Sequence, residues 1–214
     1  MSDFFFFENW TLPMAIAATA ILLVFQTVVY YAVEKLEGEP NDIHRPFDDK
    51  IPLRPAWGFV YVLWFPLIAI FPVNLFRYDS TVFGADLYAG YMIAIMIDIL
   101  ISVTIYMIYP TTFERPEPPD TFSGYFLKFI YKCSYKGVNC MPSLHCSECF
   151  IVILFAAAAT AMPWYLRLTA LAVAGGIVYS TLATKQHVIL DVISAIPLSL
   201  ICFAGGLVAS GLLF

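Results

Sequence analysis

The sequence predicts an all-α membrane protein with six transmembrane helices. Hydrophobic residues make up 61% of the 214 residues and charged residues 13%, whereas about a quarter of the residues in soluble proteins are charged. A bilayer core about 30 Å thick needs roughly 20 apolar residues per helix, so six helices and short loops account for this length. We therefore expect residues 1–214 to form a single six-helix membrane domain without a separate soluble domain.

Helix-breaking residues delimit the first three predicted spans, which cover residues 12–33, 56–76 and 86–109. The first span ends at a run of charges followed by Gly38 and Pro40, which cannot continue a helix through lipid. The connector that follows mixes apolar and charged residues between prolines, a pattern that suits the lipid headgroups. Trp57, Tyr61 and Trp64 near the start of the second span fit an interfacial aromatic belt, and a proline ends the third.

A loop of about thirty residues precedes the fourth span and is long enough to be functional. Within it Lys128, Lys132 and Lys136 recur every four residues, which predicts an amphipathic helix on the membrane surface. The last three spans are predicted over residues 143–162, 165–183 and 188–214. The glycine pair Gly175-Gly176 in the fifth span permits close helix packing.

Counting the crossings places three distant polar segments on one side of the membrane. The first, third and fifth spans end on this side, and the second, fourth and sixth begin there. Arg115, His145 and His187 therefore lie at the same end of the helix bundle, which we call the polar face.

The polar face collects side chains that suit phosphoryl transfer. His187 and Asp191 are four residues apart, so on a helix the carboxylate can accept a hydrogen bond from one imidazole nitrogen. The other nitrogen is then available as a nucleophile. His145 is placed to act as the general acid toward the leaving oxygen.

Nearby cations and a helix start are expected to bind the phosphate. Arg115 and Lys185 suit the phosphate oxygens, and Ser143 with the backbone amides of the fourth span adds donors. Glu148, one turn after His145, either orients that histidine or pairs with one of the cations. The scheme requires no metal and no cofactor, and the five cysteines form no recognisable metal-ligand spacing.

Several of these residues also have a structural interpretation. Ser143 is a suitable N-cap for the fourth span. Arg115 and Lys185 suit interfacial cations that reach the headgroups. Asp98 lies in the middle of the third span, about a helix length from Arg115, and we expect it to have a structural role.

Three segments within residues 109–191 resemble the signatures of the type 2 phosphatidic acid phosphatase superfamily, which also includes sphingolipid synthases. Arg115-Pro116 resembles the first signature, although Ile108 stands at its lysine position. Pro142-Ser143-Leu144-His145 resembles the second, with leucine in place of glycine. The third signature is matched by Ser180, His187 and Asp191. Thr181 stands at its arginine position.

The resemblance implies a covalent phosphohistidine at His187 that Asp191 orients, with His145 protonating the departing alcohol. Ser180 would then contribute to phosphate binding. Two cations of the family pattern are absent, and Lys185 looks like the local replacement for one of them. Leu144 and the Lys185-Gln186-His187 run resemble a subgroup shared by some bacterial members and the sphingolipid synthases.

The residues and the resemblance together predict an integral membrane lipid phosphatase that hydrolyses a lipid phosphomonoester or pyrophosphate. A phosphotransferase that passes the phosphoryl head group to a lipid alcohol shares the chemistry up to the phosphoenzyme and stays open. A non-catalytic lipid-binding or transport protein is the third alternative. The expected partners are a lipid phosphate and membrane lipids. The net charge of −5 gives no sign of nucleic acid, and the oligomeric state is left open.

Two arguments disagree about which side of the membrane holds the polar face. Nine of the 11 Lys and Arg residues lie in loops on this side, and only Arg77 and Arg167 lie on the other. Without Arg115 and Lys185 the ratio is seven to two, and the positive-inside rule then predicts a cytoplasmic site. The resemblance implies an extracytoplasmic site. We expect the latter, because these loops also contain many acidic residues.

The N-terminus and the cysteines give two further expectations. Residues 1–10 contain no Lys or Arg and precede an apolar run long enough to span, so a cleaved signal peptide is not expected. Cys133 and Cys140 share one loop and could pair in an oxidising compartment, but two free thiols are favoured.

Overall fold

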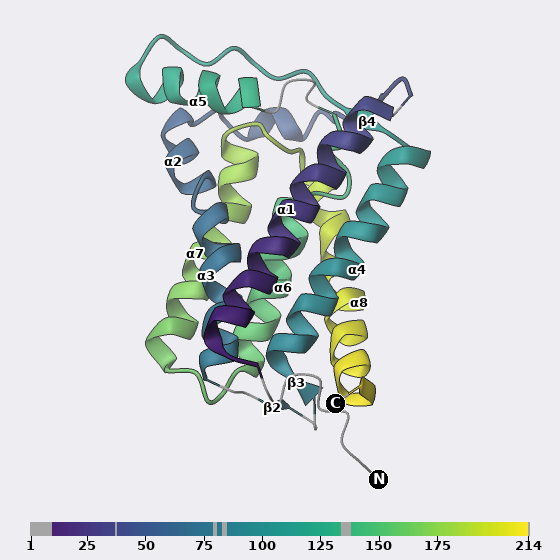
Figure 1. Cartoon of the computed structure of the whole chain (residues 1–214). Helices are drawn as coiled ribbons and strands as arrows, with labels where there is room; N and C mark the ends of the chain where they lie inside the picture. The colour runs from purple at the N-terminus through teal and green to yellow at the C-terminus, as the bar shows by residue number, and fades with distance from the viewer. Residues whose placement is uncertain (1–9, 37, 79–80, 83–84, 134–137, 214) are drawn as a thin grey trace.

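Long helices run between the two ends of the molecule in alternating directions (Figure 1). The computed structural model describes residues 10–36, 38–78, 81–82, 85–133 and 138–213. Within them the long helices are α1 (Leu12–Leu36), α3 (Trp64–Arg77), α4 (Leu87–Ile108), α6 (Leu144–Ala158), α7 (Trp164–Ala183) and α8 (Ile189–Leu213). The all-α prediction is confirmed, and most helix ends fall within a few residues of the predicted boundaries.

Five segments within the described residues are long and apolar enough to cross a membrane. They are Leu12–Leu36, Pro55–Arg77, Leu87–Ile108, Trp164–Ala183 and Ile189–Gly211. The second combines the 3-10 helix η2 (Pro55–Trp57), α2 (Gly58–Tyr61) and α3. The helix α6 has 15 residues and is therefore about 22 Å long, shorter than a bilayer core of about 30 Å. Length and composition thus support five of the six predicted spans, and the predicted end of the fourth at residue 162 is wrong.

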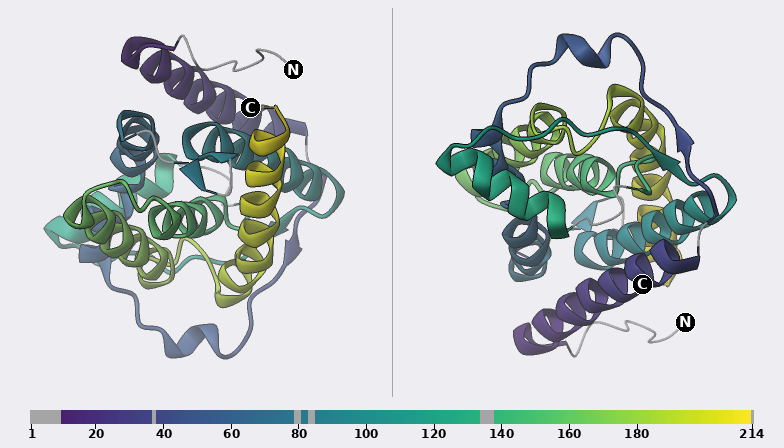
Figure 2. Two further views of the ribbon diagram at one scale, coloured as in Figure 1. Left: turned by 90° about the horizontal axis from the view of Figure 1, so that it is seen from below. Right: turned by 90° about the horizontal axis from the view of Figure 1, so that it is seen from above.

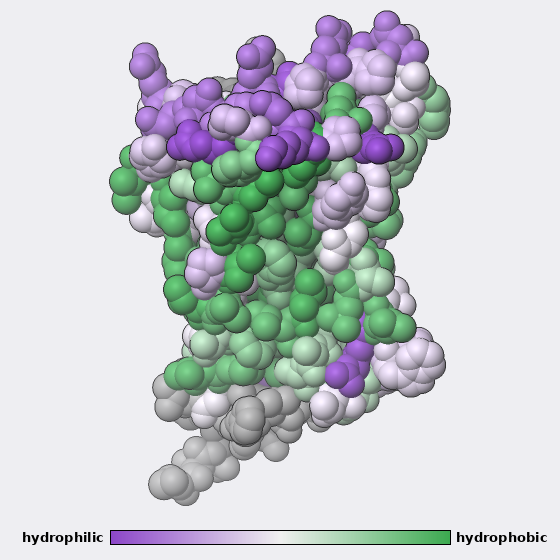
Figure 3. All heavy atoms as spheres, turned by 180° about the vertical axis from the view of Figure 1, so that it is seen from behind, coloured by the Kyte–Doolittle hydropathy of each residue, from purple (hydrophilic) through white to green (hydrophobic). Residues whose placement is uncertain are grey.

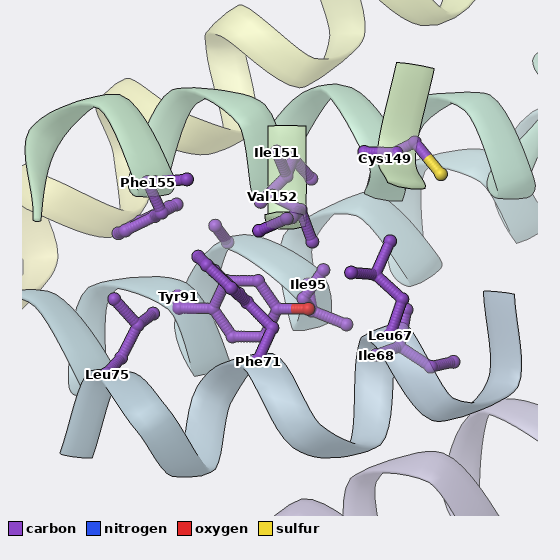
Figure 4. Packing of buried hydrophobic residues seen from close by; sticks show 14 of the residues in the cluster. Leu67, Ile68, Phe71, Leu75, Tyr91, Ile95, Cys149, Ile151, Val152 and Phe155 are labelled. Atoms are coloured by element: carbon purple, nitrogen blue, oxygen red, sulfur yellow. The ribbon is translucent and has the colours of Figure 1, made fainter. Parts of the chain in front are cut away.

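The short helix α6 lies near the middle of the bundle and packs against α4, α7 and α8 (Figure 2). Its apolar side chains meet those of α3 and α4 in the core, where Phe71 and Phe155 contact the ring of Tyr91 edge-on (Figure 4). At the crossing of α4 and α8, a Cβ added to Gly206 would lie 2.2 Å from the carbonyl oxygen of Gly90. A glycine at this position is therefore required for the close approach of the two helices.

Apolar residues form a broad belt around the helices, and hydrophilic residues cap the polar face (Figure 3). The helix α5 (Phe122–Cys133) lies across this capped end, roughly perpendicular to the long helices (Figure 1). On one side of α5 the side chains of Leu127 and Ile130 are buried, and its other side exposes aromatic residues. The predicted helix in this loop is confirmed, its position at a membrane surface stays a prediction, and Lys136 lies outside the described residues.

Two-residue strands pair near both ends of the molecule. At the polar face β1 (Asn41–Asp42) pairs in parallel with β4 (Thr111–Thr112), and the connector continues through the 3-10 helix η1 (Asp48–Lys50). The strands β2 (Thr81–Val82) and β3 (Ala85–Asp86) pair antiparallel near the opposite end (Figure 1). Strands this short have no periodic pattern, so the sequence does not predict them.

The strand β4 also positions the segment that precedes α6. The hydroxyl of Thr111 accepts the backbone N–H groups of Cys140 and Met141 at 3.2 and 3.0 Å. The loop that leads to His145 is thereby attached to the segment that leads to Arg115.

Candidate active site

His187 lies in the tight turn between α7 and α8. The backbone N–H groups of Gln186 and His187 donate to the carbonyl oxygen of Thr181 at 2.9 and 3.1 Å, which closes the end of α7. His187 Nδ1 lies 3.0 Å from Asp191 Oδ2, and the same oxygen accepts the N–H of Val188 at 3.0 Å. The hydrogen bond expected from the four-residue spacing is therefore present. A carboxylate that accepts from Nδ1–H favours the tautomer with its lone pair on Nε2.

The surroundings of His187 keep its imidazole neutral. Burial lowers the pKa of this histidine from 6.5 to about 3, the positive charge of Arg115 acts in the same direction, and a hydrogen bond with the Cys140 backbone opposes them. The ring is therefore uncharged at pH 7. The neutral form is the one whose lone pair can attack phosphorus.

His145 lies in the first turn of α6, between aromatic side chains. Its ring centroid is 4.8 Å from that of Tyr61 and 4.4 Å from that of Trp64. The centroids of His145 and His187 are 6.0 Å apart. The two rings therefore lie close enough for one phosphoryl group bound at this place to contact both.

The aromatic neighbours of His145 differ from the sequence expectation. Tyr61 and Trp64 were expected in an interfacial belt, but they are 8% and 9% exposed and pack on the imidazole. The prediction is wrong for these two side chains, because their three-residue spacing places both on the side of the segment that faces α6.

Arg115 joins the two histidines around one cavity of about 250 Å³, which we call the histidine cavity. Its guanidinium carbon lies 5.3 Å from the ring centroid of Tyr131 and 6.0 Å from that of Phe113, within range of cation–π attraction. The crossing count predicted only a common face for Arg115, His145 and His187. The structure brings all three to the same cavity.

Lys185 is directed toward the connector between α1 and η2. It has a φ of 53°, and its Nζ donates to the carbonyl oxygen of Asp48 at 2.7 Å. It lines a second, polar hollow of about 380 Å³, which His187 also lines, and it is not among the described residues around the histidine cavity. This position favours a role in holding the connector over direct contact with a phosphate between the histidines.

The hydroxyl groups of Ser143 and Ser180 are used within the helices. Ser143 Oγ accepts the N–H of Cys146 at 3.2 Å as the N-cap of α6, and Ser180 Oγ donates to the carbonyl oxygen of Ile177 at 2.7 Å. Both serines are fully buried, and neither is among the described residues that line the histidine cavity. These contacts favour structural roles for both side chains.

Glu148 and Asp98 connect α6 to its neighbours. Glu148 accepts a hydrogen bond from the side chain of Gln26 on α1, and no hydrogen bond between it and His145 is found in the described part of the chain. Asp98 accepts the hydroxyl of Ser147 at 2.6 Å. The structural role expected for Asp98 fits this contact, and Glu148 is placed to fix α6 rather than to orient His145.

Two buried carboxamides, Asn139 and Gln186, also line the histidine cavity and are 3% and 2% exposed. Neither belongs to a metal, nucleophile or acid–base pattern, and Gln186 enters the sequence prediction only as the middle residue of the Lys185-Gln186-His187 run. The available signal is position alone, since Gln186 directly precedes His187 and Asn139 stands three residues before Pro142.

The thiols and acidic groups form neither a disulfide nor a metal-ligand cluster in the described part of the chain. Cys133 is exposed, Cys140 is buried, and both are free thiols. No group of three or more His, Cys, Asp or Glu side chains there is arranged to hold a metal ion.

Comparison with known proteins finds no protein-family model, no curated protein and no solved structure that matches this chain. The phosphatase resemblance therefore depends on the motif residues and on the geometry described above.

Proposed function

We propose that this protein is an integral membrane lipid phosphatase that hydrolyses a lipid phosphomonoester or pyrophosphate through a phosphohistidine at His187. The observation that carries the proposal is the histidine cavity. It brings together a neutral, Asp191-oriented imidazole, a second imidazole 6.0 Å away and the Arg115 guanidinium. Nucleophile, general acid and phosphate cation are the three groups that covalent phosphoryl transfer requires.

The proposed reaction has two steps. In the first, His187 Nε2 attacks phosphorus, the bond from phosphorus to the lipid oxygen breaks, and His145, which enters this step protonated, gives its proton to that oxygen and becomes neutral. In the second, His145 takes a proton from water, the water oxygen attacks phosphorus, and the P–N bond breaks to release phosphate. Arg115 binds the nonbridging oxygens, which carry the negative charge in both steps.

The walls of the histidine cavity support a lipid as the substrate. Tyr31 of α1, Phe65 of α3 and Phe129 of α5 line it and are exposed on the surface of the molecule. The cavity therefore opens to the surface between these three helices. A lipid could enter from the bilayer with its head group at the histidines and its chain along the helices.

The polar hollow beside His187 supports water as the acceptor. His187 lines both this hollow and the histidine cavity, and the hollow is bordered by the ionisable side chains of Asp42, Glu114 and Lys185. The hollow can thus supply water to the histidine cavity, where it takes the place beside His145 that the lipid alcohol leaves.

We also propose that α6 completes a sixth crossing of the membrane. Its neighbours α4, α7 and α8 shield it from lipid, so a helix of 15 residues need not match the bilayer thickness. Six crossings return the C-terminal end of α8 to the side on which α1 begins, in agreement with Figure 1.

The proposed function is tested with the purified protein and a panel of lipid phosphomonoesters, pyrophosphates and phosphodiesters, with and without a lipid alcohol. Free phosphate and lipid products are measured together. We expect release of free phosphate from a monoester or pyrophosphate, with no change on addition of a chelator. Product formation only when the alcohol is present would favour the transferase, and binding without any turnover would favour the non-catalytic alternative.

We propose that the polar face is extracytoplasmic, as the resemblance implies. Cys133 is exposed at this face and the other four cysteines are buried, so one thiol reports the orientation. A membrane-impermeant maleimide should label the protein in intact cells, and the Cys133→Ser variant should stay unlabelled. Labelling that requires permeabilised cells would place the face in the cytoplasm instead.

A further inference from the structure

Three polar atoms at the histidine cavity have no hydrogen-bond partner in the described part of the protein. They are Nδ2 and Oδ1 of Asn139 and Nε2 of Gln186. Both side chains are more than nine-tenths buried. A buried amide without a partner opposes folding, so such groups in a cavity are expected to meet a ligand or water.

Hydrogen bonds of the flanking backbone fix the position of Asn139. Val138 on one side forms a bridge with Thr112, and the N–H of Cys140 on the other side donates to Thr111. Asn139 itself has a φ of 60°, a conformation that asparagine tolerates better than most residues. Its carboxamide is therefore presented to the cavity by a restrained backbone.

Gln186 is held between two residues with fixed contacts. Its backbone N–H donates to Thr181, Lys185 before it contacts Asp48, and His187 after it contacts Asp191. The two carboxamides consequently enter the histidine cavity from different loops, one before α6 and one before α8.

The unpartnered N–H groups need hydrogen-bond acceptors and the unpartnered oxygen needs a donor, and phosphate alone supplies only acceptors. A phosphate dianion accepts hydrogen bonds, so it can satisfy the N–H groups of Gln186 and Asn139 but not Oδ1 of Asn139. That oxygen requires a donor. A hydroxyl group both donates and accepts, so one hydroxyl beside the phosphate can satisfy both ends of the Asn139 carboxamide.

We propose that Gln186 donates a hydrogen bond to the substrate phosphate and that Asn139 binds a free hydroxyl next to it, so that the site selects hydroxyl-bearing lipid phosphates. This inference rests on the proposed function for the identity of the substrate class. It adds that a lipid phosphate in which every hydroxyl near the phosphate is esterified binds more weakly than one with a free hydroxyl there. The hydroxyl can belong to a monoacylglycerol phosphate or to a long-chain amino-alcohol phosphate.

The first test compares turnover of a monoacylglycerol phosphate with that of its deoxy analogue. A neutral hydrogen bond corresponds to about tenfold in an equilibrium or rate constant, so we expect kcat/KM to be about tenfold higher for the hydroxyl substrate. Asn139→Gly accommodates the positive φ and should remove this preference, because it lacks the acceptor oxygen. Asn74→Ala, on α3 and outside the cavity lining, should keep it.

The second test measures binding without turnover, so that it does not depend on catalysis. In the His187→Ala protein the fluorescence of Trp64, which lines the cavity, should report titration with both lipids and with the amino-alcohol phosphate. We expect the hydroxyl lipids to bind about tenfold more tightly than the deoxy lipid, and Asn139→Gly to abolish the difference. Gln186→Met should weaken all phosphate lipids alike.

The outcomes of the two tests separate the inference from the proposed function. Turnover of both lipids without a hydroxyl preference, or a preference that Asn139→Gly retains, would overturn the inference and leave the phosphatase standing. A preference in binding without turnover of any lipid would support the inference while removing the phosphatase. Equal binding of the hydroxyl and deoxy lipids would indicate that the carboxamides hold only water.

Discussion

Alanine at position 187 should reduce release of phosphate from any lipid substrate by on the order of 10⁴-fold or more, because the proposed nucleophile is lost. The reaction cannot proceed through a covalent intermediate when the Nε2 lone pair is absent. Initial rates of phosphate release from the purified variant check this expectation, with the thermal unfolding midpoint measured alongside to confirm folding.

His44 provides a matched control for the substitution of His187. It lies at the same polar face, where its ring is 2.9 Å from Asp49, and it lines the polar hollow but is not among the described residues that line the histidine cavity. The His44→Ala variant should retain most of its activity. If His187→Ala kept a tenth or more of the wild-type rate while remaining folded, the nucleophile would have to be another residue.

Glutamine at position 145 should slow hydrolysis of alkyl phosphates by on the order of 10²–10⁴-fold, the usual contribution of a general acid. An aryl phosphate has a leaving group that departs without protonation. Its first step should therefore be much less affected by His145→Gln, and a rapid burst of released aryl alcohol should be visible before the slow release of phosphate. The ratio of the losses for the two substrates is the measurement.

A structural role for His145 makes a different prediction. If the ring served only to fill the space beside Tyr61 and Trp64, the substitution would slow both substrates by the same factor. Equal losses for alkyl and aryl phosphates, with no burst, would therefore exclude the acid role.

The helices could be predicted because their signals are local. Asp86, at the predicted start of the third span, is the N-cap of α4 and accepts the N–H of Ala89 at 2.7 Å. The end of α6 could not be predicted in the same way, since apolar residues continue to Met162. There the side chain of Arg167, from the next helix, donates to the carbonyl oxygens of Ala156 and Ala157 at 2.8 and 2.9 Å.

The candidate site shows the same division between local and distant contacts. The contact between His187 and Asp191 follows from a four-residue spacing, which the turn before α8 preserves. The contact of Lys185 with Asp48 joins residues 137 positions apart, so the Lys185-Gln186-His187 run alone suggested a phosphate ligand. Asn139 is recognised only when tertiary packing shows that its carboxamide is buried at the cavity without a partner.

Direct detection of the phosphoenzyme tests the proposed mechanism most sharply. The His145→Gln variant should form the intermediate from an aryl phosphate and hydrolyse it slowly, because the base for the second step is missing. After an alkaline quench, mass spectrometry should find one phosphoryl group on the peptide that contains His187, and acid treatment should remove it. An unmodified His187 peptide, or an acid-stable phosphoryl group on a residue such as Ser143, would contradict the mechanism.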